Sequence, residues 1–173
     1  MEERVIHIEW DGPHSLEQLK RLDQPRDRGL YKVYGHHPVY GSNVLVYIGQ
    51  TCGQTFAARN AQHSWGGGSQ EDRRHVEVYV GRLKGAMTPS RDEWDRQIEL
   101  AERLLIHAHA PAYNSTNIDS VSESDPEVCN ARVLNWGGHR DLHPEVSGLR
   151  WTKDYTDQAK GYKVYEAQQM TNT

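Results

Sequence analysis

Apolar positions in the middle of the chain follow the two-residue period of β-strands. Val76, Val78 and Val80 alternate with more polar residues, which predicts one half-buried strand. Two further segments, residues 30–34 and 44–48, are short and rich in strand-forming residues, and a segment containing Gly, Pro and Asn joins them. We expect these two segments to form an antiparallel pair of strands.

The clearest helical period lies ahead of Pro111. Ser90 and Glu93 form a capping-box pattern, which predicts that a helix begins there, and Pro111 predicts its end. Between them, apolar residues recur three or four positions apart at Trp94, Ile98, Ala101, Leu105 and Ala108. Shorter helices are expected over residues 16–22, where Ser15 with Gln18 marks the start, and over residues 54–63.

The two ends of the chain carry weaker patterns. Residues 4–10 alternate and predict a strand, followed by a turn at residues 11–13. Residues 115–131 are polar and predict a loop, and 65–69 a flexible break. Short strands are expected at residues 132–136, 149–152 and 162–165. The whole pattern indicates an α/β chain of the α+β kind.

Composition indicates the class of protein and the compartment to expect. The chain has 173 residues, 36% of them hydrophobic, and a mean hydropathy of -0.86, so it is polar but long enough for a core. Its apolar runs fall short of the ~20 residues that span a bilayer, and its first residues do not resemble a signal peptide. Cys52 and Cys129 do not make a disulfide framework. We expect a cytoplasmic protein without a membrane segment.

Charge is distributed unevenly along the chain. The net charge is -4, yet residues 28–114 hold 10 Lys and Arg against 8 Asp and Glu, a net charge of +2. Only this middle region has a net charge that would attract a polyanion. Binding of nucleic acid through its phosphates should therefore be modest and sensitive to salt.

The same middle region holds side chains suited to phosphodiester chemistry. Tyr31 and Tyr47 lie on the two paired strands beside glycines, and two phenols could hold a water and remove its proton if a cation lowered their pKa. Arg59 and His63 are four residues apart on one helix face, where a guanidinium could bind phosphate and an imidazole could relay a proton. Strand tyrosines at a core edge and a solvated helix pair are the structural alternatives.

Two further residues complete the set. Glu102 borders the apolar stripe of the long helix, and one such carboxylate could hold Mg²⁺ with its remaining waters. Asn114 follows the end of that helix and could tie the turn back to the strand pair. An ordinary surface glutamate and an Asx-turn residue are the alternatives. The histidines at 36, 37, 107 and 109 lack zinc-site spacing, and we do not expect them to be ligands.

Taken together and in order, these residues resemble the GIY-YIG nuclease family. The resemblance spans residues 28–114, 87 of the 173. Leu30 replaces the usual isoleucine and His107 a frequent lysine. The motifs are Gly29-Leu30-Tyr31, Tyr47-Ile48-Gly49-Gln50-Thr51, Arg59 with His63, Glu102, and Pro111-Ala112-Tyr113-Asn114.

The resemblance implies a fold, a reaction and roles for residues. It implies a small three-stranded antiparallel sheet flanked by helices, as a nuclease core over residues 28–116. Residues 1–27 and 117–173 would then be extensions, the second for recognition or dimerisation. In the implied site, Tyr31 is the base or its relay, Tyr47 places the nucleophile, Arg59 stabilises the transition state, His63 receives the proton, Glu102 binds Mg²⁺ or Mn²⁺, and Asn114 supports the site. Gly49, Gln50, Thr51 and Arg59 would contact the substrate.

The resulting expectation is a divalent-metal-dependent endonuclease. Its partner would be DNA, double-stranded or structured, and the acidic flanks fit a protein that recognises a particular structure or acts as a homodimer. Two alternatives stay open: a non-cutting nucleic-acid-binding or interaction module on the same fold, and an RNA-directed or toxin-like nuclease.

Overall fold

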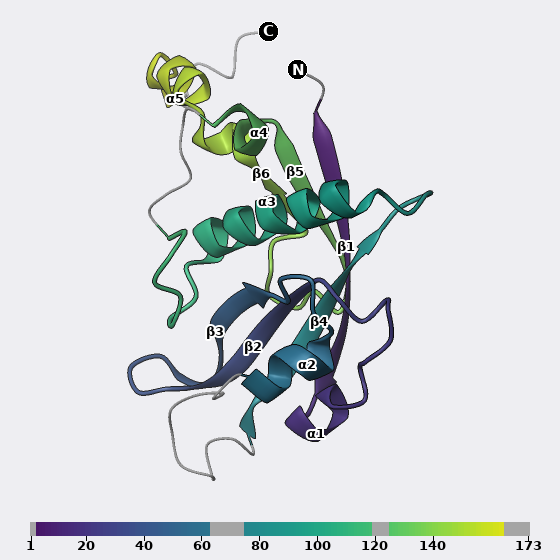
Figure 1. Ribbon diagram of the computed structural model, residues 1–173. Helices are drawn as coiled ribbons and strands as arrows, with labels where there is room; N and C mark the ends of the chain where they lie inside the picture. The colour runs from purple at the N-terminus through teal and green to yellow at the C-terminus, as the bar shows by residue number, and fades with distance from the viewer. Residues whose placement is uncertain (1–2, 63–74, 119–124, 165–173) are drawn as a thin grey trace, which may run out of the picture.

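The computed structural model describes residues 3–62, 75–118 and 125–164 (Figure 1). The strands in these ranges are β1 (Arg4–His14), β2 (Leu30–His37), β3 (Gly41–Gln50), β4 (Glu77–Lys84), β5 (Ala131–Gly137) and β6 (Glu145–Ser147). The helices are α1 (Leu16–Leu19), α2 (Phe56–Gln62), α3 (Arg91–His109), α4 (Pro126–Cys129) and α5 (Lys153–Lys160), with a 3₁₀ turn over Gly148–Trp151. The expected mixture of helices and strands is confirmed. No helix in these ranges has the length and apolarity to cross a membrane.

All of the described strands belong to one sheet, in the order β3-β2-β4-β1-β5-β6. The expected antiparallel neighbours β2, β3 and β4 are present, but the three-stranded sheet is wrong because the sheet has six strands in the described ranges. β1 pairs antiparallel with β4 on one side and parallel with β5 on the other. Ile6, Ile8 and Trp10 alternate along β1 and are almost completely buried, so one face of this strand packs into the core. The segments before residue 28 and after residue 116 thus extend the same sheet.

The capping residues in the sequence correctly predicted where α1 and α3 begin. Ser90 caps α3 by accepting a hydrogen bond from the Glu93 N–H at 3.3 Å, and Ser15 and Gln18 form a complete capping box at α1. Helix α3 ends at His109, and Ala110 caps it in a left-handed conformation with φ 43°. Pro111 therefore lies just beyond the helix, as expected.

Several weaker expectations were wrong. The turn at residues 11–13 lies inside β1, which continues to His14 past an irregularity in its register with β4. Gly148–Trp151 form a 3₁₀ turn where a strand was expected over residues 149–152, and the Ser147 hydroxyl caps this turn by accepting from the Leu149 N–H. Residues 162–164 are not a strand, and helix α4 interrupts the loop expected over residues 115–131. The break at residues 65–69 lies outside the described residues.

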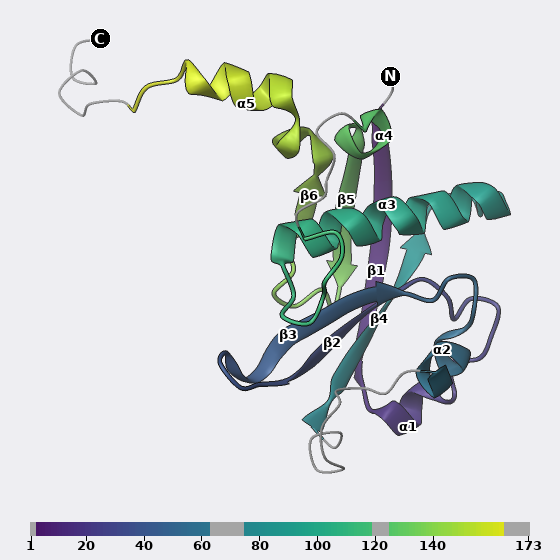
Figure 2. The same cartoon turned by 60° about the vertical axis from the view of Figure 1, so that its left-hand side comes forward.

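The sheet carries a different helix layer on each face. Helix α3 crosses one face and contributes Ile98, Ala101 and Leu105 to a core that also includes the buried residues of β1 and β5 (Figures 1 and 2). Helices α1 and α2 cover the other face over β2, β3 and β4. The second core consists of Leu19, Tyr31, Val33, Val46, Phe56, Val78 and Val80. Alternate residues of β2 therefore face different layers.

Candidate active site

Two tyrosines from β2 and β3 lie side by side on the face covered by α2. Tyr31 pairs with Gly49 across the strands, and Val33 pairs with Tyr47, so Tyr31 and Tyr47 are diagonal neighbours on one face. Their ring centroids are 6.0 Å apart with an interplanar angle of 26°. A hydrogen bond joins the two side chains. The hairpin expected from the sequence therefore brings both phenols together.

Gly49 provides the space for this pair. A Cβ atom at position 49 would lie 2.7 Å from the Tyr31 hydroxyl oxygen and 2.6 Å from the Tyr47 ring. Both contacts are too short for any side chain to be added without displacing a phenol. Gly49 thus acts by leaving room for Tyr31 and Tyr47, and it is itself buried.

Arg59 comes from α2 and reaches Tyr31. Its guanidinium hydrogen-bonds the Tyr31 side chain, and its Nε is buried without a hydrogen-bond partner in the described ranges. The connector before β2 holds the first turn of α2, because the Phe56 N–H donates to the Asp27 carbonyl at 2.8 Å and the Ala57 N–H to the Leu22 carbonyl at 3.0 Å. Backbone carbonyls of the connector thus accept from N–H groups at the start of α2, and these bonds hold in place the helix that carries Arg59.

Glu102 approaches the same hairpin from α3, the helix on the opposite face. The side chain of Gln50, the last residue of β3, donates to the Glu102 carboxylate at 2.6 Å. Burial raises the pKa of Glu102 above its usual value, while the Gln50 hydrogen bond and the Arg59 charge act against this rise. The carboxylate is half-buried, and it remains close enough to act electrostatically on Tyr31, Tyr47 and Arg59.

Burial also governs the two phenols. It raises the pKa of Tyr31 and of Tyr47 above the ordinary value of 10.0. The hydrogen bond from Arg59 lowers the Tyr31 pKa, but by less than burial raises it. Both tyrosines are therefore neutral phenols at neutral pH, able to accept and donate hydrogen bonds. A Tyr31 phenolate would form only if its proton passed to another group, with Arg59 offsetting the charge.

Asn114 ties the end of α3 to the outer edge of β3. Its Oδ1 accepts from the Ile48 N–H at 2.9 Å, and its Nδ2 donates to the Ile48 carbonyl at 2.8 Å. The neighbouring Tyr113 N–H donates to the Val46 carbonyl at 2.8 Å. These bonds cover part of an exposed sheet edge. The expected link between the turn and the hairpin is confirmed, and the polar groups of Asn114 are used by the backbone of β3.

The remaining site residues fall into different surroundings. Thr51 is buried; its hydroxyl accepts from the Gly29 N–H at 3.1 Å, and its own N–H donates to the Gly29 carbonyl at 3.0 Å. It closes the base of the hairpin. Gln50 holds Glu102, a role that sequence reasoning missed because the partner lies 52 residues away. His63 lies outside the described residues.

The donor set limits which metal could fit. Among the described residues, no group of three or more His, Cys, Asp and Glu side chains is placed to hold a metal ion. Glu102 supplies one carboxylate at this hairpin, and one of its oxygens accepts from Gln50. Mg²⁺ keeps most of its waters and binds through one or two carboxylates together with substrate phosphate, so one carboxylate suits it. A zinc site would require three or four protein ligands.

Comparisons with protein-family models, with curated proteins and with solved structures find no match to this chain. The functional interpretation therefore depends on the residues and their geometry.

Proposed function

We propose that this protein is a divalent-metal-dependent endonuclease that hydrolyses phosphodiester bonds of DNA. One observation carries the proposal: a phenol pair, a guanidinium and a carboxylate, supplied by β2, β3, α2 and α3, act on one another at the same hairpin. Each of these groups has a use in phosphodiester hydrolysis. Hydrogen bonds join Arg59 to Tyr31 and Tyr31 to Tyr47, and Gln50 holds Glu102.

Arg59 supplies the fixed positive charge in this mechanism. A guanidinium stays protonated and matches the geometry of phosphate oxygens, so it stabilises the charge that builds up in the transition state. The Arg59 side chain is half-buried, which leaves part of it open to a substrate phosphate. Its bond to Tyr31 aligns the cation with the phenol pair.

Tyr31 and Tyr47 would orient the attacking water. The Tyr31 hydroxyl donates to the Tyr47 oxygen, and a neutral phenol can still accept a hydrogen bond from water, so the pair can fix the direction of attack. The proton lost by the water would pass through the Tyr31 hydroxyl, and His63 is the acceptor expected from the sequence. Arg59 would stabilise the transient phenolate.

Glu102 would hold Mg²⁺ or Mn²⁺, with Gln50 fixing the orientation of the carboxylate. When bound, the metal would neutralise phosphate charge and favour formation of the nucleophile. DNA is the favoured substrate because residues 28–114 carry a net charge of +2, from 10 basic and 8 acidic residues. A structured or double-stranded DNA, bound by a monomer or homodimer, fits the acidic flanks.

Incubation of the purified protein with plasmid, single-stranded DNA and RNA tests this proposal. Cleavage of DNA is expected with Mg²⁺ or Mn²⁺ and not with EDTA. Glu102→Gln is the matched variant, because an amide can keep the bond to Gln50 but loses the charge; it should cut about 10²–10³-fold more slowly. Cleavage in EDTA, or full activity of Glu102→Gln, would contradict the proposed site. Binding of DNA without cleavage under every metal condition would instead indicate a binding module, and cleavage of RNA alone an RNA-directed nuclease.

A further inference from the structure

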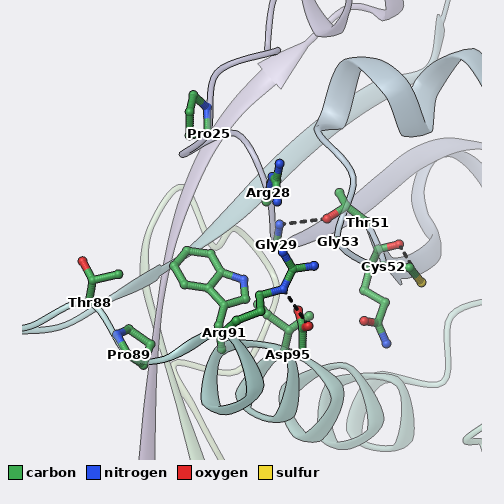
Figure 3. A pocket seen from close by; sticks show the side chains of 13 residues that line it. Pro25, Arg28, Gly29, Thr51, Cys52, Gly53, Thr88, Pro89, Arg91 and Asp95 are labelled. Atoms are coloured by element: carbon green, nitrogen blue, oxygen red, sulfur yellow. Dashed lines mark hydrogen bonds and ion pairs between the residues drawn. The ribbon is translucent and has the colours of Figure 1, made fainter.

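A separate pocket lies beside the proposed catalytic hairpin. It has a volume of about 300 Å³ and lies between the connector before β2, the turn after β3 and the first half of α3 (Figure 3). Tyr31, Tyr47, Arg59 and Glu102 do not line it. This volume is at the lower end of the range for small-molecule sites, so the pocket suits a ligand of about one nucleotide.

Two arginines give the pocket a positive charge. Arg28 enters from the connector and Arg91 from the first turn of α3, and Figure 3 shows them on either side of Gly29. Asp95 also lines the pocket and accepts from the Arg91 Nε at 2.7 Å. Two cations against one carboxylate leave a net charge of +1 in this lining. A phosphodiester group carries one negative charge, which matches this balance.

Arg28 is half-buried and lines this pocket. A guanidinium stays charged and presents several N–H donors, so it can bind a phosphate that enters the pocket. The missing side chain at Gly53 leaves space for the Arg91 guanidinium, because a Cβ atom at position 53 would lie 2.4 Å from the Arg91 Nη2.

Trp94 supplies an aromatic surface in the same pocket. One part of the side chain packs against the core beneath α3, and another part lines the cavity. A fixed indole offers a stacking surface to a nucleobase, and stacking tolerates any base because every base has a π-face. A phosphate beside the arginines and a base beside the indole are the two halves of one nucleotide.

Gln50 connects the pocket to the catalytic carboxylate. Its side chain lines the pocket and also donates to Glu102 at 2.6 Å. A ligand in the pocket would therefore lie one residue from the proposed metal ligand.

We propose that this pocket binds a nucleotide of the substrate strand next to the scissile phosphate. Arg28 and Arg91 bind its phosphate, and Trp94 stacks on its base. This inference rests on the proposed endonuclease function and adds a subsite that would position the strand.

Fluorescence anisotropy of a labelled DNA oligonucleotide in EDTA tests the phosphate contact without cleavage. Arg28→Ala should weaken binding about 10-fold and reduce the dependence of binding on salt by about one phosphate contact. Arg96→Ala is the control, because Arg96 lies on α3, the helix that carries Arg91, bonds to Glu99 and Glu127, and does not line the pocket. Equal binding by Arg28→Ala and wild type, or an equal loss in Arg96→Ala, would overturn the proposal.

A scan of abasic positions along the oligonucleotide tests the stacking contact. One abasic position should weaken binding to the wild type about 5-fold or more, because stacking contributes ~1–3 kcal/mol per base. Trp94→Leu should bind the intact strand about as weakly as the wild type binds that abasic strand. The abasic position should weaken the binding of Trp94→Leu no further. An abasic effect of the same size in both proteins would refute the stacking role. These assays measure binding alone, so failure of the subsite is distinct from failure of the nuclease, which would appear as intact DNA with wild type and metal.

Discussion

Tyr31 and Lys32 are neighbours in β2, but they belong to two very different clusters on opposite faces of the sheet. On the Tyr31 face, a second tyrosine and Arg59 surround the phenol. On the Lys32 face, Tyr34 and Tyr79 surround a lysine. Each face thus combines two phenols with basic side chains, Arg59 on one and Lys32 with Arg140 on the other, and the residue types alone do not separate them.

The Lys32 cluster is closed off from solvent. Lys32 is 0% exposed, its Nζ donates to the His139 carbonyl, and it lies 4.8 Å from the Tyr79 ring centroid and 5.0 Å from that of Trp10. The segment after β5 completes the enclosure, because the Tyr34 hydroxyl donates to the Asp141 carboxylate. These contacts join the C-terminal part of the sheet to β2, so we assign the cluster a structural role.

The Tyr31 cluster differs in its access to solvent. Tyr31 itself is buried, but Tyr47, Arg59 and Glu102 are only half-buried. A substrate could therefore contact the cation and the carboxylate without unfolding of the protein. Solvent access of the charged groups therefore distinguishes the proposed site from a polar core.

The largest predicted effect concerns the pH dependence of stability on the Lys32 face. Burial lowers the pKa of Lys32 from 10.5 to about 7, with the Asp141 charge acting against the shift and Arg140 adding to it. The folded protein then binds fewer protons than the unfolded chain between these two pKa values, so stability rises with pH above about 7. The full shift corresponds to about 5 kcal/mol, of which about 3 kcal/mol falls between pH ~7 and pH ~9.5.

Denaturant unfolding at a series of pH values measures this effect. Lys32→Met should remove the rise, and Lys84→Met should retain it, because Lys84 is exposed on β4 and pairs with Glu9. Cleavage per folded molecule should be unchanged in Lys32→Met. If the stability of Lys32→Met depended on pH as that of the wild type does, or if the variant folded but lost cleavage, the structural role of the Lys32 cluster would be contradicted.

A smaller effect is predicted at the link between α3 and β3. Asn114→Ala leaves the buried Ile48 N–H and carbonyl without partners, which should lower the free energy of unfolding by about 2–4 kcal/mol. Tyr113→Phe is the control, since its hydroxyl makes only a 3.4 Å contact with the His36 carbonyl. Thermal melting of the two variants checks this. An Asn114→Ala protein with wild-type stability but no cleavage would show that Asn114 acts in catalysis and does not merely support the fold.

Features specified by neighbouring residues were predictable from the sequence. Ser90 and Glu93 located the start of α3 because a cap is a local structure, and the β2–β3 hairpin followed from two apolar segments joined by a short loop. That hairpin is sufficient to bring Tyr31 and Tyr47 together.

Features that depend on distant pairing were not predictable in the same way. The parallel pairing of β1 with β5 joins Arg4 to Ala131, and no local signal specifies a contact over that separation. The same limit applies to the bond from Gln50 to Glu102. Lys32 carries a signal of its own in the sequence, because a lysine between the strand-forming residues Tyr31 and Val33 requires a special environment once the strand is buried.

Cleavage by Arg59→Ala tests most directly whether the Tyr31 face is catalytic. Rates on plasmid DNA with Mg²⁺ should be compared with those of Arg103→Ala, an arginine on α3 that pairs with Asp125 at 3.1 Å. We predict a loss of about 10²–10³-fold per folded molecule for Arg59→Ala and a near wild-type rate for Arg103→Ala. An Arg59→Ala protein that folds and cuts DNA at the wild-type rate would contradict the account.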